Sequence, residues 1–110
     1  MTAAPAIRLQ RCDACAHVQY PARACCEACL SDRLAAIGAD AAAGVLLART
    51  VLHHSNEEKF RAKLPLGVGL VALDEGPVVV CFAPAPHAIG DRVTVRASRG
   101  DDGRTVLTAE

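Results

Sequence analysis

The second half of the chain alternates apolar and polar residues with the period of a β-strand. Between Arg92 and Ser98, the apolar residues Val93, Val95 and Ala97 are separated by polar ones, which places the two kinds on opposite faces. Runs rich in branched apolar residues predict four more strands, at residues 44–54, 66–76, 77–83 and 104–110. These strands follow one another too closely for helical crossovers, so the pattern predicts antiparallel pairing.

Turn residues indicate how the predicted strands pair. Glu75-Gly76 is typical of the turn of a hairpin, and Asp102-Gly103 is typical of a second one between the last two strands. Gly67 and Gly69 suit a strand that coils sharply around a barrel. The sequence therefore predicts a mainly β protein whose residues 44–110 form a small five-stranded barrel, for which the OB-fold is the natural candidate.

Two segments are predicted to connect these elements. Residues 55–65 form a polar link, in which Asn56 is expected to cap a short helical turn through Lys63. In the alanine-rich segment after the cysteines, Ser31 is expected to cap a turn of helix that begins near Asp32 and ends at Gly38. The predicted division is a cysteine-rich ribbon at 1–33, a linker at 34–43 and a barrel at 44–110.

Five of the six cysteines lie close together near the start of the chain. Two Cys-x-x-Cys pairs can be drawn, and each can form a tight turn that directs two sulfurs at one point. Together they predict a Cys₄ metal site of the kind that holds structural zinc, with the ligands Cys12, Cys15, Cys26 and Cys29. An iron site of the rubredoxin type uses the same ligands. A closed four-sulfur shell leaves no position for substrate, so the metal is predicted to be structural rather than catalytic.

The other candidate reactive residues are interpreted as structural or solvated. Cys25 would break the second Cys-x-x-Cys spacing and is predicted to be a spare thiol, whereas Cys81 is expected to be buried in a strand. His17 is interpreted as a solvated loop residue. His53 and His54 are consecutive in a predicted strand and would face opposite ways, so they do not form one catalytic site.

Composition and charge narrow the function classes. The formal net charge is zero and aromatic residues make up 3% of the chain, which argues against a nucleic-acid-binding surface. The apolar run at 34–48 is interrupted by Asp40 and is not a membrane span, and residues 1–10 lack the pattern of a secretory signal. We therefore expect a cytoplasmic protein, where clustered cysteines bind metal more often than they form disulfides.

Motifs in both halves resemble one known family. The ribbon is similar to the rubredoxin-like zinc ribbon of a family of OB-fold proteins that are associated with acyl-CoA enzymes, at Gln10, Arg11, Cys12, Cys15, Pro21, Arg23, Cys26 and Cys29. The barrel half resembles the same family at Thr50, Val51, His53, the run 73–76 (LDEG), Ile89, Gly90, Val93 and Val95. Two positions depart from the family pattern: Ala16 replaces the usual knuckle glycine, and Glu27 replaces the usual proline.

The resemblance implies a partner subunit rather than a stand-alone enzyme. Members of this family are small subunits of thiolases, related condensing enzymes or hydratases that act on CoA thioesters, so a hetero-oligomer with such a protein is expected. Four arginines that cluster in sequence around the ribbon are candidate contacts for CoA phosphates, since guanidinium matches phosphate geometry: Arg8, Arg11, Arg23 and Arg33. They can equally balance the thiolate charge or lie in solvent. A single-stranded nucleic-acid-binding module is the alternative function, because both folds are also used in that way.

Overall fold

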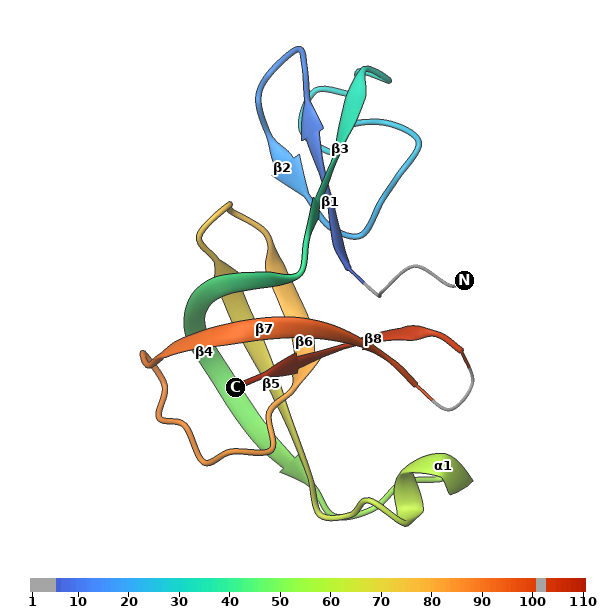
Figure 1. The fold of residues 1–110 in the computed structure, drawn as a ribbon, viewed down its shortest axis with the longest axis vertical. Helices are drawn as coiled ribbons and strands as arrows, with labels where there is room; N and C mark the ends of the chain where they lie inside the picture. Colours follow the sequence, from blue (N-terminus) through green and yellow to red (C-terminus); the bar gives the residue numbers. More distant parts are fainter. Residues whose placement is uncertain (1–5, 101–102) are drawn as a thin grey trace.

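The structure, a computed structural model, describes residues 6–100 and 103–110, which form a small sheet and a barrel (Figure 1). The sheet has the order β2-β1-β3 and is built from β1 (Ile7–Cys12), β2 (Val18–Gln19) and β3 (Leu34–Ala39). The barrel closes in the order β4-β5-β6-β8-β7, with β4 (Ala41–Leu52), β5 (Leu66–Leu73), β6 (Val78–Phe82), β7 (Arg92–Arg99) and β8 (Thr105–Ala109). The predicted mainly β fold, a Cys₄ ribbon followed by a five-stranded barrel, is confirmed.

The barrel strands pair as their turns predicted. β5 and β6 form an antiparallel hairpin in which Val68 is opposite Phe82 and Ala72 is opposite Val78. β4 pairs with both β5 and β7, and a parallel contact between β6 and β8 closes the barrel. At the β7–β8 hairpin Gly103 adopts a positive φ of 81°, whereas Asp102 lies outside the described residues.

Alternate residues of the barrel strands fill its interior. The largest buried side chains of the barrel include Leu46, Val71, Val79 and Val95, each at most 1% exposed. Gly67 lies where β5 passes close to the end of β6, because a Cβ there would collide with the carbonyl group of Ala83. This close approach explains why the second barrel strand needs glycine at position 67, a reason that adds to the sharp coiling expected from the sequence.

The predicted helical turn in the linker is wrong, because residues 34–39 form a strand. Strand β3 pairs with β1 along its whole length, from Ile7 opposite Ala39 to Cys12 opposite Leu34. Pairing with β1 satisfies the backbone of this alanine-rich segment, so tertiary structure overrides the helical propensity of alanine. The boundaries of the two domains remain a prediction.

The small sheet and the barrel share one hydrophobic core. Ile7 and Leu9 of β1 are at most 1% exposed and belong to the same cluster as Leu46 and Val95 of the barrel, and Ile37 of β3 packs against it. In Figure 1, β1 runs away from the barrel and β3 returns to it, where the chain continues into β4. The ribbon therefore packs on the barrel through the first residues of β1, whereas the first cysteine, Cys12, lies at the other end of this strand.

The polar link between β4 and β5 contains the predicted short helix. Helix α1 spans Glu58–Arg61, and the Arg61 side chain donates a hydrogen bond from Nε to the Ser55 carbonyl oxygen at 3.1 Å. β4 ends at Leu52, so His53 and His54 lie in this exposed link rather than in a strand. The argument from opposite strand faces therefore does not apply to them. No helix in the described part of the chain is long and apolar enough to cross a membrane.

Candidate metal centre

Each Cys-x-x-Cys pair forms a tight turn of the same design. In the first turn, which follows β1, the Ala16 N–H donates a hydrogen bond to the Cys12 carbonyl oxygen at 2.8 Å. In the second turn, which lies between β2 and β3, the Leu30 N–H donates to the Cys26 carbonyl oxygen at 2.9 Å. The two turns thus place their cysteines in equivalent positions, as the repeated spacing predicted.

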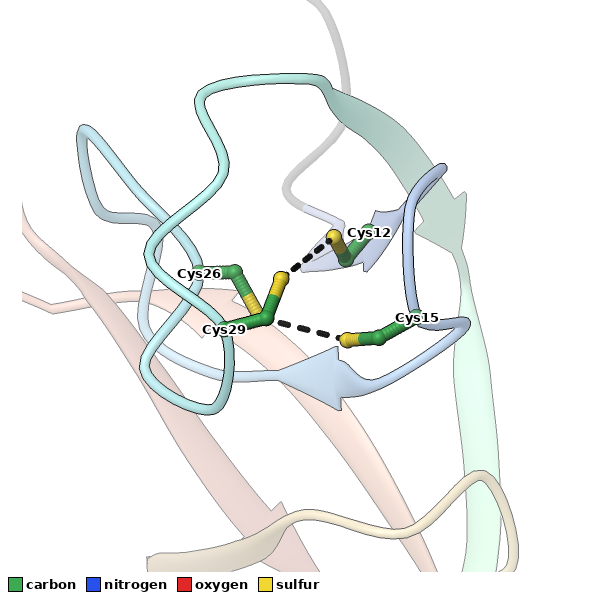
Figure 2. Close-up of side chains that lie close together, drawn as sticks. All are labelled: Cys12, Cys15, Cys26 and Cys29. Carbon is green, nitrogen blue, oxygen red and sulfur yellow. Dashed lines mark hydrogen bonds between the residues drawn. The ribbon is translucent and has the colours of Figure 1, made fainter.

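The two turns face each other and bring four sulfurs together (Figure 2). The Sγ atoms of Cys12 and Cys29 lie 3.5 Å apart, those of Cys15 and Cys26 lie 3.7 Å apart, and all four fall within 4.8 Å of one another. Four sulfurs bound tetrahedrally to one zinc at about 2.3 Å would be about 3.8 Å apart. The cluster is therefore consistent with a bound metal ion, and it is the only such group in the described residues.

The sulfurs of this cluster are close enough to shift one another's pKa. A hydrogen bond from the Cys15 backbone N–H is the main cause that lowers the pKa of Cys12 to about 6. The Ser31 backbone N–H lowers the pKa of Cys29, but hydrogen bonds with the Cys12 and Cys15 sulfurs outweigh it and raise this pKa to about 12. Four thiolates at this separation need a bound cation, which is the general reason that metal binding releases protons from such sites.

Two glutamines hold the segment that carries the second turn. Gln19 is 1% exposed, and its Nε2 donates to the Cys25 carbonyl oxygen at 3.2 Å while its Oε1 accepts from the Glu27 N–H at 2.9 Å. Gln10 Oε1 accepts hydrogen bonds from Gln19 Nε2 and from the Arg23 N–H. These bonds fix the backbone on both sides of Cys26. Nothing in the sequence marks Gln19 for this role, since a polar residue in a short strand gives no sign of being buried.

The remaining residues singled out by the sequence lie outside the sulfur cluster. His17 is not simply solvated, because its Nε2 lies 2.8 Å from Glu27 Oε1 and so links the two turns at the surface. Cys25 is partly exposed and directs its carbonyl group, not its sulfur, to Gln19. Cys81 is buried in β6 as expected, and desolvation raises the pKa of its thiol.

The four candidate arginines are all exposed, and they do not all lie on one face of the small sheet. Arg8 and Arg11 are three residues apart on β1, so strand alternation directs them to opposite faces of the small sheet. Arg23 Nε lies 3.7 Å from Glu27 Oε2 at the second turn. Their role in binding CoA phosphates remains a prediction.

Ala16 occupies a backbone conformation that favours glycine. Its φ is 65°, and Leu30 has φ 67° at the equivalent position of the second turn. The left-handed region costs an L-residue about 1–2 kcal/mol, part of which glycine recovers at the expense of backbone entropy. The family glycine that Ala16 replaces is thus explained by the geometry of the turn.

Ala16→Gly should tighten metal binding. Glycine relieves the strain but costs backbone entropy, and the net gain is about 0.5–1 kcal/mol. If metal binding and ribbon folding are coupled, this gain corresponds to about a two- to fivefold higher zinc affinity. Competition with a chromophoric chelator at constant pH measures this ratio. Ala14→Gly is the matched control, since Ala14 has no positive φ, and it should give equal or weaker affinity. A weaker affinity for Ala16→Gly than for Ala14→Gly would contradict the expectation.

Comparisons with known proteins agree with this two-part architecture. Residues 2–35 match the family described as "ChsH2, rubredoxin-like zinc ribbon domain", and residues 41–98 match "ChsH2, C-terminal OB-fold domain". A solved structure described as "Ltp2-ChsH2(DUF35) aldolase" is similar with a TM-score of 0.74 and 29% sequence identity, over 93% of this chain and 81% of that chain. A search of curated proteins found no match. The family matches cover both the ribbon and most of the barrel, and we conclude that the chain belongs to the ChsH2 family of proteins with a rubredoxin-like zinc ribbon and a C-terminal OB-fold.

Proposed function

We propose that this chain is a non-catalytic subunit of a thiolase-type enzyme complex that processes acyl-CoA. The observation that carries the proposal is the similarity, over 93% of the chain, to a structure described as an aldolase formed with Ltp2. Nearly the whole chain takes part in that similarity, so the same kind of assembly is the simplest role for it. An Ltp2-like thiolase homologue is the proposed partner, and the complex is a cytoplasmic hetero-oligomer.

The metal in this proposal is one structural zinc ion. Cys12, Cys15, Cys26 and Cys29 offer four thiolates, the ligand set typical of closed zinc sites. When bound, zinc would neutralise thiolate charge and hold the two turns together, as structural zinc does in small domains. Iron in the same shell is distinguished by its colour in the oxidised state.

The proposed lack of catalysis follows from the placement of the nucleophiles. Condensation and cleavage of CoA thioesters need an activated nucleophile or a base beside the reacting carbon. Four cysteines are committed to the metal cluster, and Cys81 is buried with a raised pKa and donates its S–H to the Gly69 carbonyl oxygen at 3.8 Å. His53 and His54 lie exposed in a polar link. The partner would therefore supply the chemistry.

Co-expression with an Ltp2-like thiolase homologue from the same genome tests the proposal. A tagged copy of this chain should retain the partner through gel filtration, and the mixture should turn over acyl-CoA while the isolated chain does not. Cys25→Ser and Cys81→Ser should leave the activity of the mixture unchanged. Turnover by the isolated chain that either substitution abolishes would refute the proposal.

Acyl-CoA binding by the same complex tests whether the arginines contact CoA. If Arg8, Arg11, Arg23 and Arg33 meet CoA phosphates, alanine variants of them should weaken acyl-CoA binding by the complex without reducing zinc content. Loss of zinc together with acyl-CoA binding would instead indicate a structural role near the thiolates.

A further inference from the structure

The outer face of the barrel over β5 and β6 is apolar although it is exposed. Neither strand contains a charged residue. The residues of this face, here called the apolar face, are Ala48, Val68, Leu70, Val78, Val80 and Phe82. Across the strands, Leu70 lies opposite both Ala48 and Val80. Val80 is 65% exposed, Val78 51% and Leu70 38%. The barrel interior is filled by the alternate residues, such as Val71 and Val79, so closing the barrel does not require this apolar surface.

The other side of the barrel is built differently. On β7 the exposed positions are polar, and two of its arginines form ion pairs: Arg92 Nη2 lies 2.7 Å from Asp74 Oδ2, and Arg96 Nε lies 3.0 Å from Glu110 Oε2. A strand with one polar face is typical of a sheet that meets water, whereas strands that are apolar on both faces are typical of sheets covered on both sides. The contrast between the two sides indicates that the apolar face is covered by another molecular surface.

The apolar face is hollowed in two places. One hollow of about 250 Å³ is lined by Val68, Val80 and Phe82 together with Tyr20 of the ribbon. A second hollow of about 200 Å³ is lined by Ala48, Val68, Leu70 and Val80, together with Arg49 and Thr50 of β4. Val68 and Val80 thus line both hollows, and Tyr20 extends the surface onto the ribbon. Such relief is suited to apolar side chains inserted from another protein.

The chemistry of the face selects the kind of occupant. In OB-folds the second and third barrel strands, here β5 and β6, form the face that commonly binds oligonucleotides. Nucleic acid needs cations for its phosphates and aromatic rings for its bases. β5 and β6 supply no cation, and Arg49, at the edge of the second hollow, donates its Nε to the Ala83 carbonyl oxygen at 3.0 Å. Arg49 is the one charged residue among those that line the two hollows, so the face is matched by a largely apolar protein surface.

We infer that the apolar face is the docking surface for the thiolase-type partner, which covers Val80 and fills the two hollows with apolar side chains. The inference rests on the proposed function for the identity of the partner. It adds which side of the barrel the partner meets, and it places the charged β7 side outside that interface.

A charge introduced at the centre of the face tests this assignment. Val80→Glu should weaken binding of the Ltp2-like homologue at least about thirtyfold, the size expected when a central interface residue is lost. Ser98→Glu adds the same charge to an exposed position of β7 and should leave the affinity within about twofold of wild type. Val80→Ser removes the apolar side chain without adding charge and should also weaken binding. This variant tests the assignment of the face if Val80→Glu does not fold. Thermal unfolding and zinc content serve as folding checks.

The outcomes separate this inference from the proposed function. If the wild-type chain binds the partner and the Val80 variants bind equally well, the face is wrongly assigned while the proposed function stands. If the wild-type chain does not bind the partner, both fail. If Val80→Glu abolishes self-association or a shift of single-stranded DNA but leaves partner binding intact, the face serves another occupant and the inference is overturned.

Discussion

Cys26→Ser should abolish zinc binding and open the ribbon, whereas Cys25→Ser should leave both unchanged. The Cys26 side chain is fully buried, and its Sγ lies 3.7 Å from that of Cys15 inside the cluster. Cys25 contributes only its carbonyl oxygen to the neighbouring network. Structural zinc supplies on the order of 10 kcal/mol or more to small ribbons, so loss of one ligand should have a large effect.

Metal analysis and hydrogen exchange measure the two parts of this expectation. Wild type and Cys25→Ser should each contain about one zinc per chain. In Cys26→Ser, or after chelation, amides in residues 13–33 should lose protection, while barrel amides such as those of Val71 and Val95 keep theirs. Ile7 and Leu9 should remain protected longer than the turns, because they belong to the barrel core. Simultaneous loss of protection in both halves would show one cooperative unit, and zinc loss in Cys25→Ser would show that the wrong sulfur was assigned.

Gly67→Ala should destabilise the barrel by about 3 kcal/mol, the upper range for overpacking at a site that cannot relax. A Cβ at this position would meet the Ala83 carbonyl group and would lie 2.7 Å from Arg49 Nη2. The backbone cannot easily move away, because the Ala83 N–H donates to the Gly67 carbonyl oxygen at 2.8 Å. Urea unfolding with zinc at saturation measures the change in the free energy of unfolding.

Gly38→Ala is the matched control for this substitution. Gly38 also lies in a strand, but a Cβ there would have no other atom within 4 Å. Its effect should stay within about 0.5 kcal/mol. Equal destabilisation by both substitutions would mean that the contact between β5 and the end of β6 does not account for the glycine at position 67.

The sequence by itself determined the features that depend on local spacing. The Cys-x-x-Cys repeat identified the four cysteines that the structure brings together, because each turn is formed within five consecutive residues. The alternation in β7 and the turn at Glu75-Gly76 predicted the strands and the β5–β6 hairpin for the same reason. The resemblance to the ribbon and barrel family also rested on these local motifs and is confirmed.

Only the tertiary structure decided the features that depend on residues distant in the chain. Leu34–Ala39 is a strand because β1 satisfies its backbone, which an alanine-rich sequence does not reveal. Gln19 is buried and supports the second turn, because its side chain forms hydrogen bonds with the backbone of Cys25 and Glu27. The apolar residues of β5 and β6 could have been core, and only barrel closure divides them into an interior set and the exposed face around Val80. In each case the physical role is set by the contact that forms across the fold, which the order of residues alone does not contain.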